Sequence, residues 1–215
     1  HVETPWRIEG WQRKGHRIIA AAQFKTGKTT LRDNLARSLV DGEAFLDRFP
    51  VQPLTGTLAV LDTEMGSRQF DEWLRDQNIK HPDRVFALPM RGQLTAFDIF
   101  DPAIRAHWAQ QFRTNGVEYL MLDNLRPLFD ALGLDENHEA GRFLTAFDQL
   151  LDESEIRDAF VVHHMGHVGE RSRGDSRLRD CRRAGGALIA VEPAVRAPLQ
   201  AIGHGMEIFQ TEARQ

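Results

Sequence analysis

Short apolar runs alternate along the chain with longer stretches in which apolar residues recur every three or four positions. The runs cover residues 16–22, 56–63, 85–90, 117–122 and 159–164, and their length is typical of buried strands. The stretches between them have the periodicity of amphipathic helices. This alternation predicts an α/β domain in which helices cover both faces of a mostly parallel sheet.

Four helices are predicted between these strands, at about residues 28–40, 67–78, 102–116 and 139–153. The third has the clearest limits, because Asp101 is a good N-cap, Pro102 suits the first helical position and Gly116 suits a C-terminal cap. Each helix carries an apolar stripe that we expect to face the sheet: Leu31, Leu35 and Leu39; Phe70, Trp73 and Leu74; Ile104, Trp108 and Phe112; Phe143, Leu144, Phe147, Leu150 and Leu151.

Composition narrows the class of protein. The 215 residues suit one α/β domain, and a hydrophobic content of 41% is enough for a core. A net charge of −4 excludes a protein that coats nucleic acid through overall basic charge. The single cysteine, Cys181, excludes an internal disulfide and a cysteine-based zinc site. No apolar run approaches about 18 residues, so we expect no membrane span and a cytoplasmic location.

The segment AQFKTGKTT, residues 22–30, lies between the first predicted strand and the first predicted helix. It fits the phosphate-binding pattern G-x-x-x-x-G-K-[ST], except that Ala22 stands at the first glycine. Gly27 lets backbone N–H groups face a phosphate, Lys28 brings charge to the β- and γ-phosphates, and the Thr29 hydroxyl ligates Mg²⁺. The alternative is a solvated surface turn. The predicted ATP site consists of Gln23, Phe24, Lys25, Thr26, Gly27, Lys28, Thr29 and Thr30.

Carboxylates follow two of the predicted strands. Asp123 ends the run at 117–122, at the carboxyl end where such sheets bind ligands, and we expect it to hold Mg²⁺ as the Walker B residue. Glu64 follows the strand at 56–63 and is expected to activate the attacking water as a general base. Asp62 competes with Glu64 for this role.

Three histidines close the last predicted core strand. His163 and His164 lie in the run itself and His167 follows it. We expect His164 to act as a polar sensor of the γ-phosphate, because neighbouring strand residues point to opposite faces. The alternatives are a zinc site and a histidine pair held by backbone hydrogen bonds. The zinc site lacks a cysteine partner and the H-E-x-x-H spacing.

Residues 171–183 form the densest cluster of charge in the chain. This segment reads as a solvated loop, as the source of an arginine finger that reaches a neighbour's γ-phosphate, or as a contact to the phosphates of nucleic acid. Asp175 and Asp180 within the segment argue against a plain DNA-binding stripe. The arginines are Arg171, Arg173, Arg177, Arg179, Arg182 and Arg183.

Residues 5–180 resemble the RecA-like AAA-family ATPases of the RepA-helicase-like type, found in actinobacterial genomes, plasmids and phages. The matching stretches are AAQFKTGKTTL (21–31), FLDRFPV (45–51), VLDTEM (60–65), LRDQNI (74–79), LDNLRPLFDALGLDENHEAGRFL (122–144) and HHMGHVGERSRGDSRLRD (163–180). The resemblance implies a RecA-like P-loop core that binds ATP and Mg²⁺ between the subunits of a homo-oligomer such as a hexamer. It also implies single-stranded DNA and a primase-polymerase as partners.

In this resemblance, Lys28 and Thr29 match the Walker A residues and Asp123 matches Walker B. Glu64 matches the catalytic glutamate and His164 the strand-end sensor. The trans-acting finger matches one of Arg173, Arg177 and Arg179, of which Arg177 is our choice.

The resemblance stops after Asp180, where relatives continue with Trp-Pro-Asp and this chain continues with Cys181. We therefore divide the chain into a RecA-like core at 1–180 and an atypical tail at 181–215, and the tail is consistent with a shifted reading frame. The predicted function is ATP hydrolysis coupled to movement on, or remodelling of, single-stranded DNA. The alternatives are a nucleotide-gated binding module, a P-loop kinase of a small molecule, and an inactive remnant.

Overall fold

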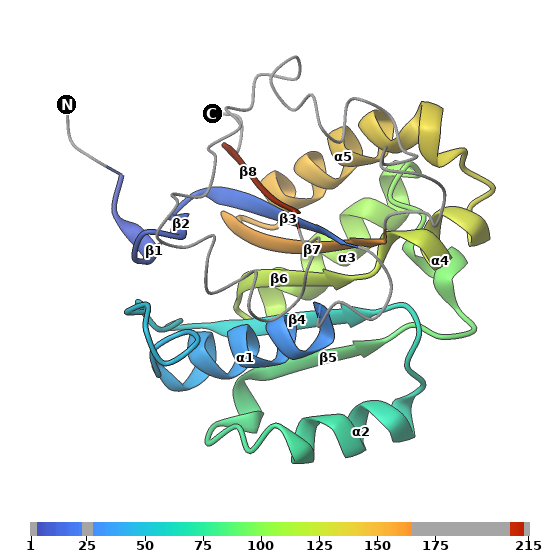
Figure 1. Ribbon diagram of the computed structural model, residues 1–215. Coiled ribbons are helices and arrows are strands. Elements are labelled where there is room, and N and C mark those ends of the chain that lie inside the picture. Colours follow the sequence, from blue (N-terminus) through green and yellow to red (C-terminus); the bar gives the residue numbers. More distant parts are fainter. Residues whose placement is uncertain (1–3, 23–27, 165–206, 213–215) are drawn as a thin grey trace.

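The computed structural model of the protein describes residues 4–22, 28–164 and 207–212 (Figure 1). A six-stranded sheet with the strand order β5-β4-β6-β7-β3-β8 forms its centre. Five strands are parallel, and β8 pairs with β3 in the antiparallel direction. The strands of this sheet are β3 (His16–Ala22), β4 (Thr57–Asp62), β5 (Val85–Pro89), β6 (Val117–Asp123), β7 (Asp158–His164) and β8 (Glu207–Glu212).

Helices cover both faces of the sheet, as the pattern of apolar residues predicts. On one face pack α1 (Lys28–Asp41) and α2 (Ser67–Asp76); on the other pack α3 (Pro102–Thr114), α4 (Leu125–Ala131) and α5 (Glu136–Glu153) (Figure 1). The two short 3₁₀ helices are η1 (Pro82–Arg84) and η2 (Leu94–Phe97). This is the α/β architecture of a RecA-like P-loop NTPase.

The core consists of two apolar layers, one on each side of the sheet. Along β6, Leu120 and Leu122 belong to the layer under α3, α4 and α5, whereas Tyr119 and Met121 belong to the layer under α1 and α2. This division follows from the alternation of side chains along a strand. The parallel strands are buried on both faces and therefore read as continuous apolar runs in the sequence.

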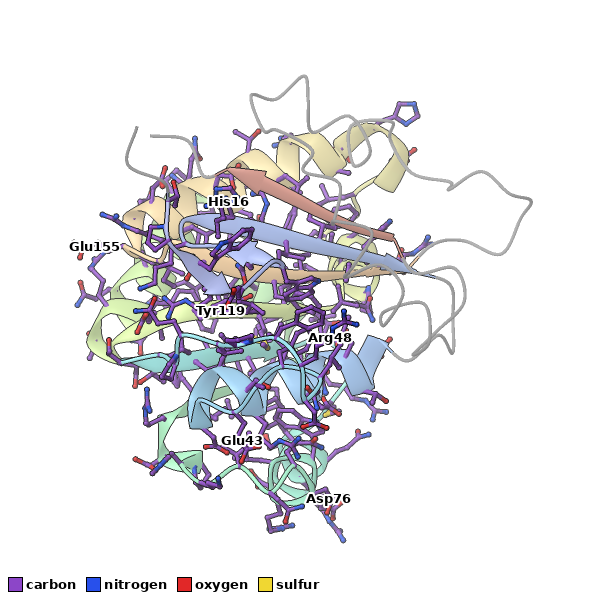
Figure 2. The ribbon with its side chains drawn as sticks, turned by 60° about the vertical axis from the view of Figure 1, so that its left-hand side comes forward. His16, Glu43, Arg48, Asp76, Tyr119 and Glu155 are labelled. Atoms are coloured by element: carbon purple, nitrogen blue, oxygen red, sulfur yellow. The ribbon has the colours of Figure 1, made fainter. Side chains whose placement is uncertain are left out.

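An N-terminal hairpin of β1 (Trp6–Ile8) and β2 (Gln12–Arg13) packs beside the amino ends of the strands. Its buried Arg7 donates from Nε to Asp158 Oδ2 (2.7 Å) and from Nη2 to Glu118 Oε1 (2.6 Å). Tyr119, labelled inside the molecule in Figure 2, donates its hydroxyl to Gln12 Oε1 (2.9 Å). The hairpin is thus joined to the sheet by buried polar contacts as well as by apolar packing.

Most predicted elements are confirmed with small shifts at their ends, while the hairpin and α4 were not predicted. The cap of α3 is as expected, because Asp101 accepts hydrogen bonds from the backbone of Ala103 and Ile104, and Gly116 has a φ of +61°. The stripe residues of the four predicted helices are buried or half-buried. Within the described residues, no helix is both long and apolar enough to cross a membrane.

The strand suggested near residues 206–209 is present as β8, at 207–212. It extends the central sheet at the edge of β3, so one segment of the proposed tail contributes to the core sheet. The division at residue 180 stays a prediction.

Candidate functional site

The candidate site lies at the carboxyl ends of the parallel strands. There β4 ends at Asp62, β6 ends at Asp123, and these two residues are register partners in the sheet. On the other side of β6 and β7, β3 ends at Ala22, paired with His164 of β7. The catalytic and metal-binding candidates that the structure describes therefore come from one edge of the sheet, where α/β proteins bind their ligands.

The phosphate loop joins β3 to α1 in the order that the sequence predicts. Helix α1 begins at Lys28, directly after the loop, so that its N-terminal N–H groups and the positive end of its dipole lie where the pattern requires them. Thr30 is exposed in the first turn. Residues 23–27, which are Gln23, Phe24, Lys25, Thr26 and Gly27, lie outside the described residues.

Arg32, one turn beyond Lys28, lies at the centre of a group of carboxylates. Its side chain is 1% exposed, and its Nη1 donates to Asp62 Oδ2 and Asp123 Oδ2, both at 2.7 Å. Its Nε donates to Asp33 Oδ1 at 2.9 Å, and the ring of Trp73 in α2 lies 4.8 Å from the guanidinium carbon. One cation thus contacts three carboxylates.

The carboxyl end of β6 is fixed by its neighbour β4. The backbone N–H of Thr63 donates to the Asp123 carbonyl (2.7 Å), and the N–H of Asn124 donates to Thr63 Oγ1 (3.0 Å). The Thr63 hydroxyl in turn donates to the Asn124 carbonyl (3.0 Å). Asn124 caps α4 by accepting from the N–H of Arg126. Hydrogen bonds with Thr63 therefore fix the end of β6, and the Asn124 cap fixes the start of α4 directly after Asp123.

Burial raises the pKa of Asp123 to about 6. The Arg32 guanidinium lowers this pKa, but Asp62, Glu64 and Asp33 raise it through charge repulsion. A carboxylate that resists ionisation beside other carboxylates is typical of a functional site. Because three carboxylates face one guanidinium, the ionised group carries an excess of negative charge.

This excess charge fits a divalent cation bound at Asp123. Among the described residues, no group of three or more histidine, cysteine, aspartate and glutamate side chains could hold a metal ion. A Mg²⁺ ion at Asp123 would therefore depend on further oxygens, which a P-loop threonine and nucleotide phosphates provide in P-loop proteins. The donor set of the site suits Mg²⁺ bound together with a nucleotide.

Asp62 and Glu64 differ in what they are free to do. Asp62 is 3% exposed, and besides Arg32 it binds the backbone N–H groups of Glu64 (2.9 Å) and Met65 (2.7 Å) through Oδ1. Both of its oxygens are thus engaged in holding the loop after β4. Glu64 is exposed at this loop. Of the two candidates for the general base, Glu64 is the one whose position suits a contact with water.

The two histidines that end β7 occupy successive positions of the strand. His163 is buried at 4% exposure and pairs with Ala21 in the register, and His164 is the last residue of β7. The role of His164 as a sensor stays a prediction. His167 and the arginines at 171–183, including Arg173, Arg177 and Arg179, lie outside the described residues.

The sequence did not predict a role for Arg32 at the site. It predicted Trp73 only as an apolar residue of a helix, and not as a partner of Arg32 and Asp33. The available signal for Arg32 is its spacing, because a residue four positions after Lys28 lies on the same face of the helix. Its three carboxylate partners come from residues 33, 62 and 123, and two of these are far away along the chain. Only the folded sheet brings them together.

A parallel sheet, a phosphate-loop sequence between its strand β3 and helix α1, and carboxylates at adjacent strand ends define a P-loop nucleotide-binding protein. A family model described as an AAA domain matches residues 2–170 of the chain. This match covers well over half of the sequence, and the chain therefore belongs to this family of P-loop ATPases. No curated protein matches the chain significantly.

Proposed function

We propose that the protein is a Mg²⁺-dependent ATPase that couples hydrolysis to movement on, or remodelling of, single-stranded DNA. The family indicates an ATPase, and the observation that carries the catalytic assignment is the placement of Asp123 and Glu64 at the ends of adjacent strands. Both residues lie at the edge of the sheet from which the phosphate loop leaves. This arrangement supports water attack on a bound nucleotide.

Each residue of the site has a separate task in this proposal. Lys28 binds the β- and γ-phosphates at the N-terminus of α1, and Thr29 with Asp123 holds the metal, whose charge stabilises the negative charge that develops during transfer. Glu64 accepts a proton from the attacking water. His164 senses the γ-phosphate from the end of β7. Arg177 reaches the site of a neighbouring subunit in a homo-oligomer such as a hexamer.

The DNA part of the proposal rests on the resemblance to RepA-like helicases. Fold and family do not fix the substrate of a P-loop protein, so this part needs its own test. A net charge of −4 means that a DNA strand would be held by local basic segments rather than by the whole surface. A primase-polymerase remains the proposed partner in replication.

A nucleotide-gated binding module is the second candidate, and one observation favours it. Asp123, the proposed metal ligand, is already paired with a cation of its own chain, Arg32. A protein in this state would bind nucleotide and switch between binding partners, while it hydrolyses ATP slowly. DNA-stimulated hydrolysis separates the two candidates.

The deciding experiment measures steady-state ATP hydrolysis by the purified protein with and without single-stranded DNA. We expect turnover that increases with DNA and that is lost in Lys28→Ala. Turnover that DNA does not change would leave an ATPase and refute the motor. Nucleotide binding without turnover would support the binding module.

A further inference from the structure

We infer that Arg32 is a positioning residue, which holds Asp123 and the loop of Glu64 in register with the phosphate-binding end of α1. The inference rests on the proposed ATPase function and deepens it. It assigns to one buried side chain the task of joining the three elements of the site. Arg32 itself is not assigned contact with the nucleotide.

The burial of Arg32 is the first observation. Removing a guanidinium from water is unfavourable, so a side chain that is 1% exposed requires strong partners. Arg32 lies in the second turn of α1, four residues after Lys28. Its position is therefore tied to that of the helix end that would bind phosphates.

The contacts of Nη1 fix the two strand ends. This one nitrogen lies 2.7 Å from Asp62 Oδ2 and 2.7 Å from Asp123 Oδ2. The two carboxylates belong to adjacent strands, β4 and β6, and would repel each other without a cation between them. Arg32 thus sets the distance between the two carboxylates and directs one oxygen of Asp123 toward α1.

Asp62 connects Arg32 to the loop that carries the proposed base. The Oδ2 atom of Asp62 binds Arg32, while its Oδ1 atom accepts from the N–H groups of Glu64 and Met65. The backbone that carries Glu64 is therefore connected to Arg32 through a single carboxylate. A displacement of Arg32 would shift this loop.

The third contact holds the helix that follows the loop. Trp73 of α2 lies with its ring 4.8 Å from the Arg32 guanidinium carbon, and its Nε1 donates to Asp33 Oδ1 (2.9 Å). The same Asp33 oxygen accepts from Arg32 Nε. Helix α2, which follows the Glu64 loop, is thus joined to α1 through Trp73.

Lysine is the variant that tests geometry apart from charge. A guanidinium donates in several fixed directions, whereas an ammonium group is a point charge on a flexible stem. Arg32→Lys should therefore keep a cation near the carboxylates and lose the simultaneous contacts. We expect kcat to fall about 10- to 100-fold, because small misplacements of reacting groups have effects of this size. We expect the Kd for ATP to change by about threefold or less.

The chain offers a matched control in Arg7. It is also buried, at 4% exposure, and also binds two carboxylates, but at the opposite ends of the strands. Arg7→Lys should lower the midpoint of urea unfolding and leave kcat of the folded protein unchanged. An equal loss of kcat in both variants would reduce Arg32 to a structural role and overturn the inference.

A milder variant covers the case in which Arg32→Lys does not fold, and a second measurement covers the case in which the unaltered protein binds ATP without turnover. Trp73→Phe keeps an aromatic ring and removes only the Nε1 donor, and it should lower kcat by about two- to fivefold. The second measurement is the Mg²⁺ concentration at half-maximal ATP binding, which should rise in Arg32→Lys because Asp123 is no longer oriented.

The outcomes separate the inference from the proposed function. If the unaltered protein hydrolyses ATP and both Arg32→Lys and Trp73→Phe match its kcat and Mg²⁺ dependence, the inference fails and the ATPase stands. If the unaltered protein binds ATP without turnover, a raised Mg²⁺ requirement in Arg32→Lys supports the inference and an unchanged one overturns it. If it binds no nucleotide, both fail.

Discussion

The sheet holds a buried arginine at each end, and the two are surrounded differently. Arg7 at the amino ends meets Glu118 and Asp158, and Glu118 also accepts from the N–H groups of Thr55 and Gly56. Arg32 at the carboxyl ends meets three carboxylates. Each cluster has more carboxylates than cations, and the excess is one carboxylate around Arg7 and two around Arg32.

The pKa values of the carboxylates record this difference. Burial would raise the pKa of Glu118, but hydrogen bonds from Gly56, Arg7 and Thr55 outweigh it and lower the pKa to about 2. Burial raises the pKa of Asp123 to about 6, and Arg32 does not offset it. A carboxylate whose pKa is lowered by its partners stabilises the fold, whereas a carboxylate whose pKa stays raised would be stabilised by a further cation. The same residue types therefore stabilise the fold at the amino ends, and in the proposed function they hold the metal at the carboxyl ends.

The largest effect is expected at the carboxyl ends, from Glu64→Gln. This change removes the proposed base and keeps the shape of an exposed side chain, so ATP binding should persist. We expect kcat to fall about 100- to 10,000-fold, the usual range for loss of a general base. Single-turnover hydrolysis and equilibrium ATP binding measure the two quantities. Normal hydrolysis by this variant would show that Glu64 is not the base.

At the amino ends, Arg7→Met should act on stability alone. It leaves the buried Asp158 without its cation, and breaking such a pair lowers the free energy of unfolding by about 3–5 kcal/mol. Urea unfolding at neutral pH provides the measurement. Arg13→Met in the same hairpin is the control, because Arg13 makes weaker contacts. It stacks on Trp6 at 4.1 Å and its Nη1 donates to the exposed Thr4 carbonyl (2.6 Å), and each of these contacts is worth about 1 kcal/mol or less. Similar losses in the two variants would contradict the assigned difference.

Glu118→Gln should lower the stability of the protein by an amount that depends on pH, because it removes a charge at the amino ends of the strands. Because folding lowers the pKa of Glu118 from 4.5 to about 2, its contribution is complete above pH 4.5 and is lost as the pH falls toward 2. The variant should be less stable by about 1–2 kcal/mol at pH 7, and this gap should narrow below pH 4.5. Urea unfolding at a series of pH values tests the sign. A gap that widens with acid would refute it.

The smallest effect is expected for Tyr119→Phe, which removes the hydrogen bond to Gln12. A buried hydrogen bond of this kind contributes about 1 kcal/mol. Tyr119 is the only tyrosine of the sequence, and burial raises its pKa above the usual value. Its ultraviolet titration in the native protein should therefore coincide with alkaline unfolding. Titration of the phenol before unfolding would show that the hairpin does not shield the Tyr119 hydroxyl from solvent.

The repeating pattern of apolar residues was enough to predict the sheet, its main helices and the cap at Asp101. Helix α4 was missed because its seven residues include Pro127 and span too few turns to show periodicity. The strands of the hairpin are shorter still. At the site, the positions of Asp123 and Glu64 at strand ends could be predicted because each follows an apolar run, while their roles stay predictions. Arg32 could not, because its partners at 62 and 123 become neighbours only through the pairing of β4 with β6.

The pairing of β8 with β3 has a consequence for how the protein behaves when shortened. Strand β8 covers β3 from His16, opposite Glu212, to Ala21, opposite Glu207. It thereby occupies a row of backbone donors and acceptors that would otherwise be open to other chains. A chain cut before residue 207 would present β3, the strand that leads into the phosphate loop, as a bare edge. Pairing of such chains along that edge would then distort β3 and with it the nucleotide site.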